Sequence, residues 1–149
     1  MVYAPEDEAW VNNELEVNIE DGPEPFELCM KERGDIPPGR FLLDSVCHGI
    51  THSRRTIVVL SKHFMSNRMC HFQLHIACLR LMQEGRDVLI LIFLEDIPDK
   101  DKTLLLRQIL CSNKAILKWP PDNVGRDLFW QTLKEELKMP VIVNRRYEL

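Results

Sequence analysis

The sequence lacks any long hydrophobic run. Its longest apolar stretch is Val88–Leu94, far shorter than the roughly 20 residues that a membrane-spanning helix needs. The N-terminus, MVYAPEDEAW, has no basic segment followed by an apolar one, so we expect no signal peptide. Internal repeats and low-complexity segments are also missing. These absences favour an ordinary globular domain, and 149 residues suffice for one domain with a sizeable core.

The sequence also lacks an excess of positive charge. The 19 lysines and arginines are outnumbered by 23 acidic residues, which gives a net charge of −4. This balance argues against a nucleic-acid-binding groove, because such a groove needs clustered basic residues. The cysteine count of 5 is odd and contains no CxxC pair, so we expect reduced thiols in a cytosolic domain. They are Cys29, Cys47, Cys70, Cys78 and Cys111.

Apolar runs with strand character alternate along the chain with segments of helical period. Strands are predicted at 26–30, 56–60, 88–94 and 115–119, and residues 1–4 resemble the tail of a further strand. Helices are predicted around 8–19, 42–50, 70–83, 104–110 and 129–137, with a plain connection at 61–67. This order predicts an α/β fold: a flavodoxin-like, five-stranded parallel sheet with helices on both faces and a truncated first strand.

The segment KERGDIPPGR, residues 31–40, follows the carboxyl end of a predicted strand. It is a poor phosphate loop, because Arg40 and Phe41 replace the Lys-Ser/Thr pair and two prolines remove backbone donors. Its Arg-Gly-Asp tripeptide is a poor adhesion signal without a secretion signal or a disulfide pattern. A rigid loop that contacts another protein is the remaining interpretation.

Two other kinds of site have weaker support. His71, His75 and Cys78 fall on one helix face with a spacing that can hold zinc, but no fourth ligand is evident. His48 and His52 form a similar pair. Serine, histidine and aspartate occur without any recognisable hydrolase motif such as GxSxG.

The predicted helix at 70–83 carries two apolar stripes, which is more than one core-facing stripe requires. The helix is either deeply buried or presents a partner surface beside its core face. One stripe holds Met69, Phe72, Ile76 and Leu79, and the other holds Cys70, Leu74, Ala77, Cys78 and Leu81.

Several short motifs follow one another along the chain in a characteristic order. They are the acidic turn 6–8 before Trp10-Val11, the segment Leu28-Cys29 before Asp35-Ile36-Pro37-Pro38-Gly39, the ending Leu117-Lys118-Trp119-Pro120, and Phe129-Trp130. Together they resemble the TIR (Toll/interleukin-1 receptor homology) domain of Toll-like receptors, with Gly34 inserted between the usual Arg and Asp. The resemblance implies a TIR domain over 1–139 and a C-terminal tail over 140–149.

The resemblance also implies a function. Such domains signal on the cytoplasmic side of a plasma or endosomal membrane, pair with another receptor TIR domain, and recruit adaptor TIR domains such as the myeloid differentiation adaptor. No cofactor or nucleic acid is implied. The partner-binding residues carried over to this chain are Arg33, Gly34, Asp35, Ile36, Pro37, Pro38, Gly39, Arg40, Cys70 and His71.

Some TIR domains are enzymes that cleave NAD with a glutamate in the pattern Trp-Cys-x-x-Glu. Here the pattern reads Met69-Cys70-His71-Phe72-Gln73. A glutamine side chain cannot carry the negative charge of that glutamate. The sequence therefore predicts a binding domain rather than an enzyme.

Overall fold

The computed structural model describes residues 1–20, 55–84, 89–112 and 115–138. Its sheet contains β1 (Thr56–Leu60), β2 (Leu89–Phe93) and β3 (Ile116–Lys118), all parallel and in this spatial order. Val2 adds a parallel bridge to Val58 on the outer side of β1, so residues near the N-terminus do pair with the sheet as predicted. The α/β fold with a parallel sheet is confirmed. The predicted strand at 26–30, the helix at 42–50 and the tail at 140–149 lie outside the described residues.

The central strand β2 is buried at every position. Parallel strands covered by helices on both faces have no side that needs to meet water, which explains the unbroken run of apolar residues. β1 has the same burial pattern. Both strands were predicted from sequence, and the structure confirms them.

The N-terminal helix is continuous but changes geometry along its length. It consists of η1 (Pro5–Asp7), α1 (Glu8–Trp10), the π-helical turn η2 (Val11–Leu15) and α2 (Glu16–Ile19). The structure confirms the helix predicted around 8–19, and its apolar residues Val11, Leu15 and Ile19 are fully buried. The N-cap residue of this helix is Ala4, and no side chain caps this end.

A further correction concerns residues 61–67, which were predicted to be a plain connection. They contain the short helix α4 (Lys62–Met65), which begins at Ser61 and is followed by α5 (Arg68–Glu84). The remaining elements are η4 (Asp99–Asp101), α6 (Leu104–Ser112) and α7 (Asn123–Lys138). A one-turn helix such as α4 is too short to show a helical period, so sequence pattern could not reveal it.

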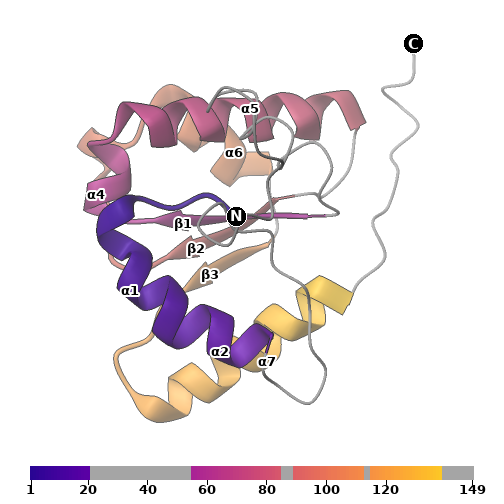
Figure 1. The fold of residues 1–149 in the computed structure, drawn as a ribbon. Coiled ribbons are helices and arrows are strands. Elements are labelled where there is room, and N and C mark those ends of the chain that lie inside the picture. Colours follow the sequence, from indigo (N-terminus) through magenta and orange to yellow (C-terminus); the bar gives the residue numbers. More distant parts are fainter. Residues whose placement is uncertain (21–54, 85–88, 113–114, 139–149) are drawn as a thin grey trace, which may run out of the picture.

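The helices form one layer on each face of the sheet (Figure 1). α4, α5 and α6 pack against the face that carries Val58, Leu60, Leu89 and Leu91. The N-terminal helix and α7 pack against the alternate residues Ile57, Val59, Ile90 and Ile92. Two apolar clusters therefore hold the fold together, and the strands separate them because successive side chains point to opposite faces.

Candidate interaction site at the start of α5

The described part of the predicted partner surface lies at the start of α5, at the carboxyl ends of the parallel strands. Ser61 directly follows β1, and Glu95 comes two residues after β2. The backbone N–H of Lys62 donates a 2.7 Å hydrogen bond to Oε1 of Glu95. This is the edge at which open α/β sheets usually carry their binding residues.

Two buried hydrogen bonds of the Ser61 hydroxyl fix the segment that follows β1. The Ser61 hydroxyl donates to Oδ2 of Asp7 at 2.5 Å and accepts the backbone N–H of Phe64 at 3.1 Å. Asp7 and Ser61 are both buried. These two bonds give the buried polar groups the partners that they need. They also connect the N-terminal helix to the first turn of α4.

Cys70 sits in the first turn of α5, where its backbone N–H donates to the side chain of Asn67 at 3.2 Å. Its side chain is 2% exposed and belongs to the core cluster beneath α5. Burial raises the pKa of the Cys70 thiol to about 12, and the charges of Glu6 and Asp7 add to this effect. The structure therefore holds Cys70 as a protonated, packed thiol.

His71 is half-buried beside Cys70. Its Nε2 lies 2.7 Å from the carbonyl oxygen of Met65, and since a carbonyl can only accept, Nε2 carries the proton of this bond. The ring also lies 6.3 Å from that of Phe64. His71 of α5 is thus hydrogen-bonded to the last residue of α4.

The zinc alternative gains no support here. Within the described ranges, no group of three His, Cys, Asp or Glu residues is placed to hold a metal ion. His75 is exposed and Cys78 is half-buried, and burial raises the pKa of the Cys78 thiol.

The two apolar stripes of α5 have different surroundings. Cys70, Leu74 and Ala77 are buried against the sheet. In the other stripe, Phe72 and Leu79 are exposed by 39% and 44%. Gln73, at the position of the enzymatic glutamate, is half-buried. The outer stripe therefore offers apolar surface beside the core face.

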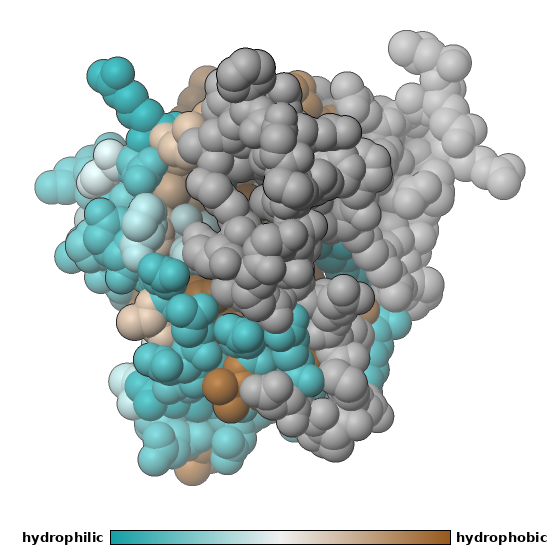
Figure 2. Space-filling view, viewed as in Figure 1, coloured by the Kyte–Doolittle hydropathy of each residue, from teal (hydrophilic) through white to brown (hydrophobic). Residues whose placement is uncertain are grey.

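The described surface around α1 and α2 is different in character. It is mostly hydrophilic, with only small, separated hydrophobic areas (Figure 2). The described part of the N-terminal helix contains Glu6, Glu8, Glu14, Glu16 and Glu20 and no basic residue. In the described segments, no helix has the length and hydropathy that crossing a membrane requires.

Several motif residues have a structural role. The Trp10 ring lies 5.3 Å from Trp119 and 6.1 Å from Trp130, and Trp119 lies 5.1 Å from Phe129. Arg126 covers Trp119, with its guanidinium carbon 4.7 Å from the ring centroid. These aromatic residues, far apart in the sequence, join the N-terminal helix, the end of β3 and α7 in one cluster.

The other predicted partner residues, Arg33 to Arg40, lie outside the described residues, so their role stays a prediction. Sequence reasoning missed Asp7, Ser61 and Glu95, which hold the site together. The only local signal was that Ser61 and Glu95 closely follow buried strands, where polar residues reach the carboxyl edge of the sheet.

Comparison with known proteins agrees with this architecture. The family model for the TIR domain matches residues 2–140. The chain is 37% identical over 139 residues to Toll-like receptor 2 type-2 of Gallus gallus, covering 91% of this chain and 18% of that protein. It is 36% identical over 141 residues to Toll-like receptor 4 of Homo sapiens, covering 92% and 16%. The chain thus spans less than a fifth of these curated relatives.

A solved structure is also similar. The crystal structure of the TIR domain of a Toll-related receptor from Hydra magnipapillata aligns with a TM-score of 0.69 at 27% identity. The alignment covers 93% of this chain and 95% of that one. Sequence motifs, fold and all three comparisons agree: the chain belongs to the TIR domain family.

Proposed function

We propose that the chain is the cytosolic signalling domain of an innate immune receptor. It acts by associating with other TIR domains and by recruiting adaptor TIR domains, such as the myeloid differentiation adaptor. The observation that carries this proposal is the similarity to Toll-like receptors over 91% of the chain. In the complete receptor the domain would lie on the cytoplasmic side of a plasma or endosomal membrane.

The main contact in this proposal is the segment from Arg33 to Arg40. Pro37 and Pro38 restrict the unfolded and unbound conformations of this segment, so less ordering remains to oppose binding. Arg33, Asp35 and Arg40 supply charges that can set the register against a partner. The start of α5, around the buried Cys70 and the half-buried His71, supplies a second contact.

The geometry at α5 supports the second contact. The hydrogen bonds of Ser61, Asn67 and His71 fix the first turn of α5 relative to the sheet. The exposed side chains Phe72 and Leu79 then lie on a rigid element. Rigid apolar anchors favour binding because little conformational freedom is lost when they are covered.

The experiment is a binding titration of the chain against an adaptor TIR domain. Pro38→His replaces a proline in the proposed contact, and Pro121→His replaces an exposed proline after β3 as the matched control. We expect Pro38→His to weaken binding and Pro121→His to leave it unchanged, with circular dichroism showing that both remain folded. Equal binding by folded Pro38→His and wild type would remove this segment from the mechanism.

We further infer that the domain does not cleave NAD. Gln73 cannot supply the carboxylate that the enzymatic TIR domains use at this position. Incubation with NAD followed by nicotinamide detection tests this inference. Turnover clearly above buffer, lost in a Gln73→Ala variant, would assign catalysis to this chain.

A further inference from the structure

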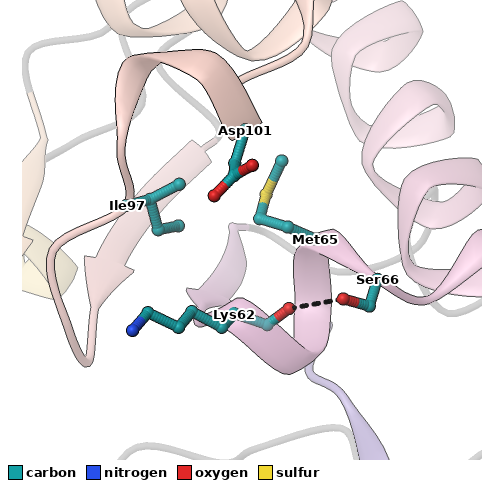
Figure 3. A pocket seen from close by; sticks show the side chains of 5 residues that line it. All are labelled: Lys62, Met65, Ser66, Ile97 and Asp101. Carbon is teal, nitrogen blue, oxygen red and sulfur yellow. Dashed lines mark hydrogen bonds between the residues drawn. The ribbon is translucent and has the colours of Figure 1, made fainter.

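A small cavity of about 230 Å³ opens between α4 and the loop that follows β2. Its walls are formed by Lys62, Met65, Ser66, Ile97 and Asp101 (Figure 3). Pockets for cofactors and drug-sized ligands usually start at roughly 300 Å³. The volume therefore suits a single side chain better than a cofactor.

The cavity is held in shape from both sides. Glu95, at the start of the loop, accepts the backbone N–H of Lys62 at 2.7 Å. At the other end, Arg107 donates to the carbonyl oxygen of Asp99 at 2.6 Å, and Lys102 pairs with the Asp99 carboxylate at 3.0 Å. A cavity with fixed walls needs little reorganisation when it is filled.

The lining is apolar at its centre and acidic at one end. Ile97 is 6% exposed and Met65 is half-buried, so both present packed apolar surface. The Ser66 hydroxyl is used locally, since it donates to the carbonyl oxygen of Lys62 at 3.1 Å. The Asp101 carboxylate points toward Met65 and Ile97, while the Lys62 ammonium extends away from Met65 (Figure 3).

The cavity lining carries one carboxylate, that of Asp101, and one ammonium, that of Lys62, which extends away from the apolar lining (Figure 3). Residues 95–101 contain four acidic side chains and one lysine. Lys102 holds the pKa of Asp99 below its usual value through a hydrogen bond and its charge. Within the described residues, no hydrogen bond or ion pair engages the Asp101 carboxylate. The cavity thus offers a free anion next to apolar surface.

We propose that this cavity receives an arginine side chain from a protein partner. The methylene groups of the arginine would pack on Met65 and Ile97, and its guanidinium would pair with Asp101. Arginine fits better than lysine because its planar fork can form two parallel hydrogen bonds with one carboxylate. The proposal involves none of residues 31–40, so its test is independent of the test of the proposed adaptor contact.

The test uses the 149-residue chain with methyl-labelled methionine and isoleucine and follows the Met65 and Ile97 methyl signals by NMR. The probe is N-acetyl-arginine N-methylamide, and the matched citrulline compound is its neutral control. We expect the arginine probe to shift both methyl signals at millimolar concentrations and the citrulline probe to bind about fivefold more weakly, since one exposed ion pair distinguishes them.

Two variants decide which carboxylate is responsible. Asp101→Asn removes the proposed partner, and Asp127→Asn removes an exposed carboxylate on α7 as control. We expect Asp101→Asn to reduce arginine binding to the level of citrulline and Asp127→Asn to leave it unchanged. Equal binding of the two probes, an equal effect of the two variants, or no methyl shift up to about 100 mM probe would each overturn the proposal.

Discussion

The hydroxyl of Ser61 lies 2.5 Å from a carboxylate oxygen of Asp7, although the two residues are 54 positions apart in the sequence. The same hydroxyl accepts the backbone N–H of Phe64, so one side chain serves both a buried carboxylate and a helix start. This contact joins the beginning of the chain to the carboxyl end of β1. The start of α5, one of the two proposed contact surfaces, depends on it.

We expect Ser61→Ala to lower the free energy of unfolding by about 1–3 kcal/mol, because it leaves the buried Asp7 carboxylate and the Phe64 N–H without their partner. Urea unfolding followed by fluorescence measures this change. Ser66→Ala is the control, since Ser66 is exposed and bonds only within its own turn. A free energy of unfolding of Ser61→Ala within about 0.5 kcal/mol of that of the wild type would show that these hydrogen bonds do not stabilise the fold.

The buried thiol of Cys70 is expected to be chemically inert. With a pKa of about 12, only about one thiol in 10,000 is ionised at pH 8, and thiolate is the reactive form. We expect iodoacetamide to modify Cys70 at least about 100-fold more slowly than the exposed Cys111. Mass spectrometry of peptides after timed quenching measures both rates. Similar rates in the folded protein would show that the thiol is accessible.

The same thiol gives stability an alkaline pH dependence. The pKa of an unperturbed thiol is 9.0, and that of Cys70 in the folded state is about 12. At pH values between these two, the unfolded chain binds fewer protons at Cys70 than the folded chain does. The free energy of unfolding therefore falls as pH rises through this interval. Urea titrations from pH 8 to 10.5 check this, with Cys70→Ala as the comparison. An identical slope in both proteins would mean that Cys70 does not contribute.

Gly125, in the first turn of α7, is expected to resist substitution. A Cβ placed there would lie 2.9 Å from Cβ of Pro120 and 2.6 Å from Oδ1 of Asp122. Gly125→Ala should thus destabilise the domain, although alanine is favoured over glycine inside a helix by about 1 kcal/mol. Gln131→Ala, at an exposed position of α7, is the control and is expected to be neutral. A raised melting temperature for Gly125→Ala would disprove the clash.

The exposed stripe of α5 is expected to affect binding but not folding. The double variant Phe72→Ser, Leu79→Ser should weaken adaptor TIR binding about tenfold or more, because both side chains are proposed anchors. Val124→Ser, which changes a side chain exposed by 80% on α7, is the matched control. Calorimetric binding and melting temperatures are measured for all proteins. Equal losses in the control and the double variant would point to a nonspecific effect.

Much of the fold followed from local pattern. The unbroken apolar run predicted a strand at 88–94, and helical period predicted a helix around 129–137. The structure has β2 and α7 there, with β2 buried at every position and with Phe129, Leu133 and Leu137 of α7 buried. Both patterns reflect contacts with a whole layer rather than with one partner. The motifs Trp10-Val11 and Phe129-Trp130 identified the family, and the structure shows that their aromatic side chains belong to one packed cluster.

The sequence by itself determined the fold class, the family and the missing carboxylate at position 73, because each depends on residue type and order along the chain. Only the tertiary structure decided where Asp7 and Glu95 point, which stripe of α5 faces outward, and that Asp101 meets Met65 and Ile97 at one cavity. Such contacts join residues that are distant in sequence, so no local period encodes them. They form only when the strands place their carboxyl ends along one edge of the sheet.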